Sequence, residues 1–218
     1  MPELLFAAAF TLWGSPTTWL EIVAFVLALA TVACNIRENH WGWPLAMISS
    51  ALYALLFWRS KLYGDASLQV FFVIVSFWGW WQWLGLGRPA GQAGAARLAL
   101  DPARLRVRRL DARQRVQVVL VCALLWPAMG AFLKHFTDTD VPWWDAFPTA
   151  LSVVGQILLG RKIIENWVLW WFVNAASVGL FAFKGLWLTC LLYTLFLGMA
   201  VAGWRTWQAR MHAASDRP

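Results

Sequence analysis

Residues 167–183 read WVLWWFVNAASVGLFAF, a run of 17 residues without a charged side chain. As an α-helix this run would be about 26 Å long, close to the roughly 30 Å of hydrocarbon in a bilayer. Six further apolar segments of similar length occur in the chain. The seven predicted spans are residues 17–33, 43–58, 66–84, 115–133, 143–159, 167–183 and 186–205. The sequence therefore predicts an all-α integral membrane protein with seven transmembrane helices.

The composition agrees with a chain that has lipid as part of its solvent. Apolar residues make up 61% of the 218 residues and charged residues only 13%, and the mean hydropathy is +0.57. A soluble globule of this length could not bury so much apolar surface and cover it with so few charges. The same numbers exclude a disordered chain. Many of the 18 Trp residues stand near the ends of apolar runs, where indole rings suit the membrane interface.

The sequence has no motif of a catalytic, metal or nucleotide site. HExxH, GxSxG and GxxxxGK[ST] do not occur, so zinc hydrolysis, serine hydrolysis and a Walker-type ATPase have no support. Cys34, Cys122 and Cys190 lie far apart inside apolar runs and form no disulfide or metal-binding pattern. We therefore expect no enzyme activity, no catalytic residue, no metal and no cofactor.

The basic residues favour one orientation in the membrane. If seven spans alternate, one side holds residues 34–42, 85–115, 160–166 and the C-terminal segment. That side carries 14 of the 18 Lys and Arg, and the other side carries 4. The positive-inside rule then places the N-terminus outside and the C-terminus in the cytoplasm. This split accounts for the net charge of +7 without nucleic acid as a partner, and we expect the basic residues 97–115 to lie on anionic lipid.

An internal repeat relates the two ends of the chain at an offset of 124 residues. Residues 19–83 align with residues 143–207 without a gap, and 14 of the 65 pairs are identical, against about five expected by chance for this composition. The identities include Trp43/Trp167, Gly79/Gly203 and Trp83/Trp207. Each half holds three spans. Because three is an odd number, two adjoining halves would have opposite orientations in the membrane, and the single span between them gives both halves the same orientation. Duplicated halves of this kind are a recurrent transporter plan, with the substrate site at the repeat interface.

These observations predict six parts. They are an interfacial N-terminal segment (1–16), a first three-helix repeat (17–84), a basic cytoplasmic linker (85–114), a linker transmembrane helix (115–133), a second three-helix repeat (143–207) and a cytoplasmic tail (208–218).

Two stretches carry a family resemblance. KLYGDASLQVFFVIVSFWGWWQW at 61–83 and GRKIIENWVLWWFVNAASVGLFAFKGLWLT at 160–189 resemble the PnuC family of bacterial vitamin transporters, in particular its nicotinamide riboside branch. The resemblance covers residues 17–207. It implies a 3 + 1 + 3 protein, SWEET-like in plan, in the bacterial cytoplasmic (inner) membrane. It also implies uptake of nicotinamide riboside by facilitated diffusion, followed by trapping by a cytoplasmic kinase. Related members carry thiamine or riboflavin, which are the alternative substrates.

The acidic residues agree with uncoupled transport. Ion-coupled carriers usually place ionisable groups at membrane depth, whereas Glu21, Asp65, Asp145 and Glu165 all lie near span ends. A membrane enzyme and a vitamin-binding receptor subunit are the competing classes, and flux into protein-only liposomes would separate them from a facilitator. The sequence leaves open whether the chain forms a homo-oligomer.

Five residues are the candidates for substrate binding. The pyridinium ring of nicotinamide riboside suits an aromatic face, and its carboxamide and ribose need amide or hydroxyl partners away from water. The candidates are Gln69, Gln156, Trp170, Asn174 and Tyr193.

The repeat supports this choice, because identities kept in both halves are explained by common packing. Asn174 aligns with Ser50, Gln156 with Val32, and Gln69 with Tyr193. The spacing also predicts that Trp167, Trp170, Trp171 and Asn174 share one helix face. The alternative role of each amide is to tie two helices together.

Overall fold

The computed structural model describes residues 8–12, 15–59, 63–85, 106–137, 139–183, 185 and 187–215. The helices of this part are α2 (Trp19–Ile36), α3 (Gly42–Arg59), α4 (Tyr63–Trp83), α6 (Ala112–Phe136), α7 (Pro142–Gly160), α8 (Asn166–Phe183) and α9 (Trp187–Ser215). Each predicted span coincides with one of these helices, so the prediction of seven helices is confirmed. By length and composition, α2, α6, α8 and α9 are able to cross a membrane.

A short antiparallel hairpin, which the all-α prediction did not include, precedes α2. Its strands are β1 (Ala8–Leu12) and β2 (Ser15–Thr18). The segment is too short for a stable helix, and its threonines favour extended chain. Thr18 then caps α2, because its Oγ1 accepts the N–H of Glu21 at 3.3 Å while Glu21 Oε2 accepts the N–H of Thr18 at 2.8 Å. The interfacial position of 1–16 stays a prediction, and residues 1–7 and 13–14 lie outside the described residues.

Two helices, α6 and α9, extend well beyond their predicted spans. α6 begins at Ala112 rather than Arg115, because Asp111 Oδ1 accepts the N–H of Gln114 at 2.7 Å and Gln114 Oε1 accepts that of Asp111 at 3.2 Å. α9 continues beyond the predicted end at Arg205 to Ser215. The end of the predicted linker 85–114 and much of the predicted tail 208–218 are therefore helical. Residues 86–105 of the linker lie outside the described residues.

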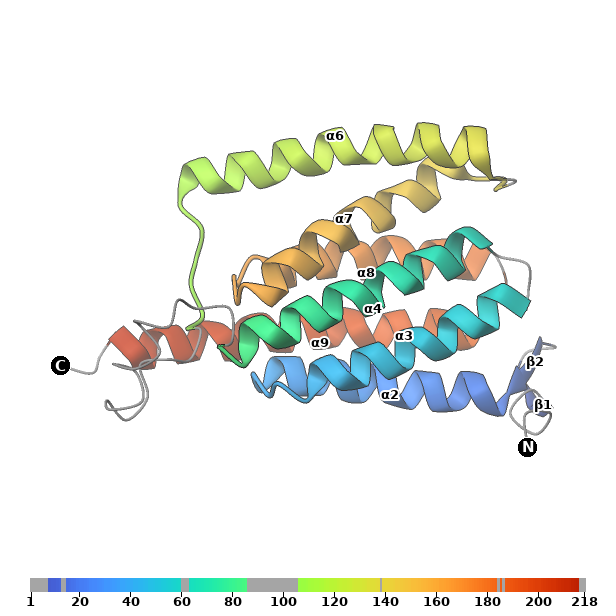
Figure 1. Ribbon diagram of the computed structural model, residues 1–218, viewed down its shortest axis with the longest axis horizontal. Helices are drawn as coiled ribbons and strands as arrows, with labels where there is room; N and C mark the ends of the chain where they lie inside the picture. The colour runs from blue at the N-terminus through green and yellow to red at the C-terminus, as the bar shows by residue number, and fades with distance from the viewer. Residues whose placement is uncertain are drawn as a thin grey trace.

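Six helices form a closed ring, and α6 lies outside it. Around the ring α2 packs against α3, α3 against α4, α4 against α7, α7 against α8, α8 against α9, and α9 against α2. α6 packs against α7 on the outside (Figure 1). Each half of the chain thus contributes three consecutive helices, and the last helix of each half meets the first helix of the other.

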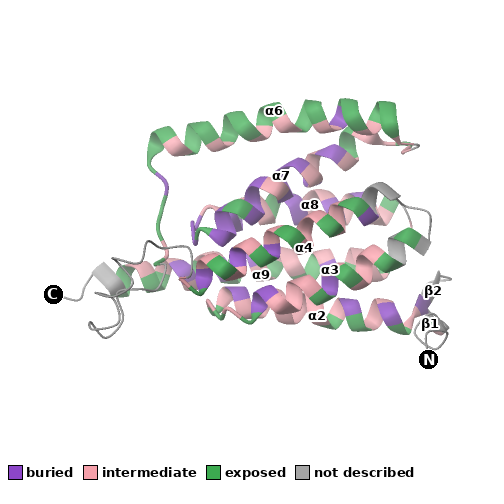
Figure 2. Ribbon diagram, viewed as in Figure 1, coloured by how far each residue is buried: buried purple, intermediate pink, exposed green. Residues whose placement is uncertain are grey.

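The outer surface of the bundle is apolar. Exposed residues run along most of α6 (Figure 2), where Leu124 is 71% and Val119 66% exposed. Exposed large apolar side chains such as Ile74 and Phe77 continue this surface on α4. Such surfaces are unfavourable in water and match the hydrocarbon of a bilayer.

Tryptophan rings pack on glycines in the same way in both halves. The Trp43 ring covers Gly79 and the Trp167 ring covers Gly203, so closely that a Cβ atom at either glycine would overlap the ring. Both pairs join the first turn of one helix to a neighbouring helix, and both keep the offset of 124 residues. The common-packing interpretation of these identities therefore has a physical basis.

Four rings meet at one end of the bundle and are called here the tryptophan cluster: Trp43, Trp83, Trp167 and Trp207. Trp43 and Trp83 meet edge to face with centroids 5.4 Å apart, and so do Trp167 and Trp207. The indole of Trp83 donates to the carbonyl of Leu159 at 3.3 Å, and that of Trp207 donates to Asn35, the equivalent position, at 3.2 Å. This end, where α2, α4 and α7 finish, also carries Arg37, Arg161 and Arg210 and is called the basic end.

Candidate functional site

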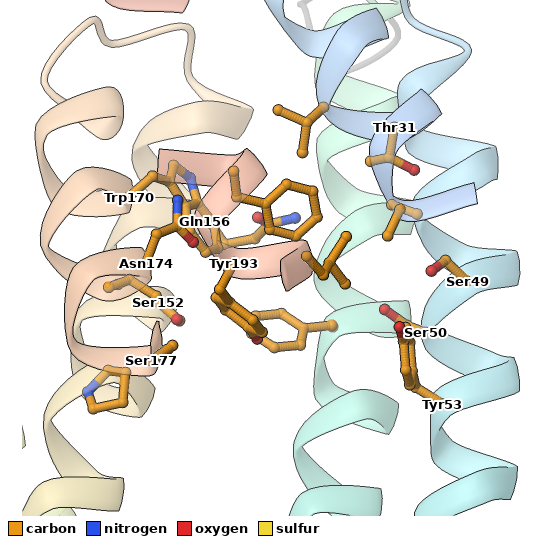
Figure 3. A pocket seen from close by; sticks show the side chains of 18 of the residues that line it. Thr31, Ser49, Ser50, Tyr53, Ser152, Gln156, Trp170, Asn174, Ser177 and Tyr193 are labelled. Carbon is orange, nitrogen blue, oxygen red and sulfur yellow. The ribbon is translucent and has the colours of Figure 1, made fainter. Parts of the chain in front are cut away.

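A cavity of about 330 Å³ lies inside the ring. All six ring helices contribute residues to its lining, whereas no residue of α6 lines it. Several polar side chains reach the cavity from α2, α3, α7, α8 and α9 (Figure 3). The cavity is thus a mixed polar and apolar space enclosed by helices from both halves of the chain.

All five predicted site residues line this one cavity. Gln69 reaches it from α4, Gln156 from α7, Trp170 and Asn174 from α8, and Tyr193 from α9. Asn174 is 3% and Gln156 7% exposed. Their role in substrate binding remains a proposal.

Only part of the predicted tryptophan face is turned towards the cavity. Trp167 and Trp170 line the cavity with Asn174, but Trp171 does not and is 41% exposed. Trp171 stands at the edge of the helix face defined by the other three, and the ring of helices turns that edge outward.

Sequence reasoning missed a set of hydroxyl groups in the lining. The set comprises Thr31, Ser49, Ser50, Tyr53 and Ser76 in the first half and Thr149, Ser152, Ser177 and Thr189 in the second. Three of these donate to backbone carbonyls: Thr31 Oγ1 to Leu27 at 2.9 Å, Ser49 Oγ to Ala24 at 3.2 Å, and Thr149 Oγ1 to Asp145 at 2.9 Å. The repeat alignment could have predicted one of these hydroxyls, because Ser50 aligns with the candidate residue Asn174.

The two halves contribute equivalent positions to the lining. Eleven pairs that differ by 124 residues line the cavity. They are Ala28/Ser152, Val32/Gln156, Asn35/Leu159, Ala46/Trp170, Ser49/Val173, Ser50/Asn174, Tyr53/Ser177, Leu68/Leu192, Gln69/Tyr193, Phe72/Phe196 and Ser76/Ala200. The backbone scaffold of the cavity is thus shared while its chemistry differs. Gln156, Trp170 and Asn174 gather on one side, and Thr31, Ser49, Ser50 and Tyr53 lie opposite (Figure 3).

The lining contains one acidic residue and no basic one among the described residues. Asp145, in the first turn of α7, lines the cavity and accepts a hydrogen bond from Thr139. Within the described ranges, no group of three His, Cys, Asp or Glu residues is placed to hold a metal ion. The site can therefore offer amides, hydroxyls and aromatic rings to a ligand.

The sequence matches the family described as nicotinamide mononucleotide transporter over residues 18–209. This chain belongs to that family. The match includes α2 to α8 in full and α9 as far as residue 209. The predicted membership of the PnuC family is confirmed, and the chain is a multi-pass inner-membrane transporter rather than an enzyme.

Of three curated relatives, two are named for nicotinamide riboside and one is named for riboflavin and roseoflavin. The chain is 26% identical to the nicotinamide riboside transporter PnuC of Escherichia coli, covering 89% of this chain and 87% of that one. It is 27% identical to the nicotinamide riboside transporter PnuC of Neisseria mucosa, covering 88% and 73%. It is 25% identical to the riboflavin/roseoflavin transporter RibM of Streptomyces davaonensis, covering 93% and 90%.

A solved structure shows the same fold. The crystal structure of the vitamin B3 transporter PnuC superposes with a TM-score of 0.70 at 24% identity, covering 88% of this chain and 81% of that chain. This likeness supports the arrangement of the helices and carries no argument about the ligand.

Proposed function

We propose that this protein takes up nicotinamide riboside by facilitated diffusion through the cavity inside the six-helix ring. The observation that carries the proposal is a lining with four amide side chains and two indoles, and with no Lys or Arg among the described residues. Its volume falls in the range of small-molecule sites, about 300–1,000 Å³. Two of the relatives are named as nicotinamide riboside transporters.

The lining favours the riboside over the mononucleotide that the family description names. A phosphate group needs Arg or Lys side chains or a helix N-terminus to replace its water. The described lining contains no such side chain, and its one charged residue, Asp145, would repel a phosphate. A cationic ligand without phosphate matches these charges better.

The side chains suggest how the ligand is held. Trp170 would face the pyridinium ring, which its π-system attracts. Asn174 and Gln156 lie beside the Trp170 ring. They would form hydrogen bonds with the carboxamide of the ligand, since amides both donate and accept. The ribose would then point across the cavity towards Gln69, Tyr193 and the hydroxyls of α2 and α3.

The architecture that we propose for this function is two parallel three-helix repeats joined by α6. The closed ring, the equivalent lining positions and the repeated tryptophan–glycine contacts support it. In this plan, SWEET-like in its 3 + 1 + 3 order, the substrate lies where the repeats meet and one repeat moves against the other. We further propose that the basic end faces the cytoplasm and that the N-terminus is outside.

The test is flux into liposomes that contain the purified protein alone. We expect saturable uptake of labelled nicotinamide riboside that stops at equal concentrations inside and outside. A proton or sodium gradient should not drive accumulation, because no acidic residue lies in the middle of a described helix. Accumulation above equilibrium under a gradient would contradict the uncoupled mechanism, and absence of flux would contradict the facilitator. In cells, net uptake would then depend on a phosphorylating enzyme.

Riboflavin is the second candidate substrate, because the chain is similar to RibM over 93% of its length. The isoalloxazine ring is neutral and larger, so it gains nothing from a cation–π contact. Calorimetric binding of nicotinamide riboside, thiamine and riboflavin to the same preparation separates the candidates. Tighter binding of riboflavin would overturn our choice of substrate and leave the transporter assignment in place.

A further inference from the structure

Three charged side chains form one cluster at the basic end. Lys162 Nζ donates to Glu38 Oε2 at 2.8 Å, and Arg210 Nη1 donates to Glu38 Oε1 at 2.7 Å. The side chains of Lys162 and Glu38 are only 7% and 17% exposed. Burial by itself would raise the pKa of the Glu38 carboxyl, but the hydrogen bonds and charges of Lys162 and Arg210 outweigh burial and lower that pKa. Glu38 is thus a charged, firmly held carboxylate that joins two cations.

Glu38 and Lys162 are equivalent residues of the two halves, because their numbers differ by the repeat offset of 124. Both stand just after a helix, α2 or α7, and both adopt a positive φ, of 56° and 50°. Two equivalent residues of related halves touch each other only near the axis that relates the halves. The ion pair therefore lies where the halves meet, and a movement of one half against the other would change its length.

The ion pair covers the tryptophan cluster, and the cluster bounds the cavity. On the outer side, Lys162 Nζ lies 4.7 Å from the centroid of the Trp83 ring. On the inner side, Trp167 and Ala200 belong to the same packed cluster and also line the cavity. The four rings are at most 7% exposed. In the described part of the chain, the cavity is thus separated from the basic end by these rings and the ion pair above them.

Two equivalent indole groups in the cluster are left without an acceptor. Nε1 of Trp43 and Nε1 of Trp167 are buried and have no hydrogen-bond partner among the described residues. A buried donor without a partner is destabilising, and water would reach both groups if the cluster opened. The two unpaired indole N–H groups therefore destabilise the closed arrangement, and opening the cluster would remove this destabilisation. The ionic contacts of Glu38 oppose opening.

We propose that Glu38, Lys162 and Arg210 are the latch of a gate at the basic end, and that the tryptophan cluster is the barrier that this latch holds shut. The proposal rests on the proposed transport function, because a carrier with alternating access opens its cavity to each side in turn. Breaking the latch shifts the population towards the form whose cavity is open at the basic end. Glu38, Lys162 and Arg210 therefore control how fast substrate moves between the cavity and the solution at the basic end.

The test measures access to the cavity rather than transport. Ala200→Cys, in a background where the three native cysteines are replaced by Ala, puts a single thiol between the tryptophan cluster and the cavity. A membrane-impermeant maleimide is added on the side of the basic end, in vesicles oriented for this purpose. We expect Glu38→Gln and Lys162→Met each to raise the labelling rate by about tenfold or more. Arg210→Gln should raise it less, because the Arg210 side chain is 43% exposed.

Arg37→Gln is the matched control. It removes a charge from the same loop, but the side chain is exposed and only the Arg37 carbonyl contacts the latch, by accepting a bond from Arg210 at 3.0 Å. It should leave the labelling rate unchanged. An equal rise in this control would show a general loosening of the loop and overturn the latch.

Unchanged labelling in folded, monodisperse Glu38→Gln and Lys162→Met variants also overturns the gate. If those two variants fail to fold, Arg210→Gln decides, and no rise in its labelling rate overturns the proposal. Labelling requires no substrate, so a wrong choice of vitamin would leave this result intact. Conversely, failure of the gate would leave calorimetric binding of nicotinamide riboside to the unaltered protein unchanged.

Discussion

Asn174 is 3% exposed and lines the cavity at a position whose equivalent in the other half is Ser50. Gln69 and Tyr193 form a second such pair, and Val32 and Gln156 a third. A small asymmetric ligand cannot make the same contacts with both halves of a symmetric scaffold. The side chains that break the repeat are therefore the ones on which binding and specificity should depend.

Replacing the cavity amides should weaken binding of nicotinamide riboside. Asn174→Leu or Gln69→Leu would leave a polar group of the ligand unpaired, at a cost of about 1–3 kcal/mol, which corresponds to roughly 5- to 150-fold weaker binding. Isothermal titration calorimetry on monodisperse variants measures this change. Gln117→Leu is the matched control, because Gln117 is an exposed amide on α6 outside the cavity. Unchanged affinity in the two cavity variants would show that these amides only connect helices.

Two neighbouring tryptophans allow a paired test of the aromatic contact. Trp170→Leu should weaken binding by about 0.5–2 kcal/mol, because the pyridinium would lose its aromatic face. Trp171→Leu should leave affinity unchanged, since Trp171 is 41% exposed and does not line the cavity. The measurement is the ratio of the two dissociation constants from the same calorimetric series. Equal losses in both variants would contradict the placement of the ring of the ligand at Trp170.

Between the elements, packing depends on tryptophans that fill the space left by glycines. Trp43 joins α3 to Gly79 of α4, and Trp167 joins α8 to Gly203 of α9. Both tryptophans also contact a second indole edge to face, an arrangement that adds to the stabilisation from buried area. The element contacts that the repeat preserves are therefore those that hold each three-helix half together.

Adding one methyl group at these glycines should destabilise the bundle. Gly79→Ala and Gly203→Ala would push a Cβ atom into an indole ring, at a cost of about 1–3 kcal/mol for overpacking. Thermal unfolding in detergent, with monodispersity as a second measure, detects the loss. Gly198→Ala is the control, because no atom lies within 4 Å of a Cβ at Gly198 of α9. A similar loss in the control would point to a backbone effect instead of ring overlap.

Trp43→Leu should likewise reduce folding or expression rather than affinity alone.

At the scale of the molecule, six of the described helices form a closed ring with α6 on its outside. This closure brings the start of the second half, α7, against the end of the first, α4, and brings α9 against α2. Because both junctions involve equivalent helices, the cavity is lined by residues of both halves. α6 adds apolar surface towards lipid, and in the proposed 3 + 1 + 3 plan it is the odd helix that lets the two three-helix halves run in the same direction.

The orientation of this molecule is testable with two exposed positions at opposite ends. In a cysteine-free background, Asp140→Cys between α6 and α7 should react with an impermeant maleimide added to intact cells. Arg113→Cys at the basic end of α6 should react only after permeabilisation, because the positive-inside rule places that end in the cytoplasm. Labelling of Arg113→Cys from outside, with Asp140→Cys protected, would reverse the topology. A cysteine at Gly91 would also test the predicted cytoplasmic linker, but Gly91 lies outside the described residues.

The seven helices of the bundle, and five residues that line its cavity, could be predicted from the sequence. Uncharged runs of about 17–20 residues are a strong signal for membrane helices, and the 124-residue offset identified which side chains the halves do not share. The sequence did not reveal the hairpin before α2, the early start of α6 at its Asp111 cap or the outward turn of Trp171. Those features depend on local hydrogen bonds and on how far each helix is rotated in the ring.

By itself, the sequence indicated a membrane-embedded chain with an internal repeat, because apolar length, charge distribution and repeat identities are properties of the chain, and its resemblance to the PnuC family indicated a transporter. Only the tertiary structure decided that Glu38 meets Lys162, that four tryptophans close one end, and that hydroxyls from α2 and α3 face the amides from α7 and α8. The Glu38–Lys162 ion pair and the Trp83–Trp207 contact each join residues 124 positions apart. They exist because the ring closes, and ring closure depends on the sum of many weak packing contacts that no single stretch of sequence encodes.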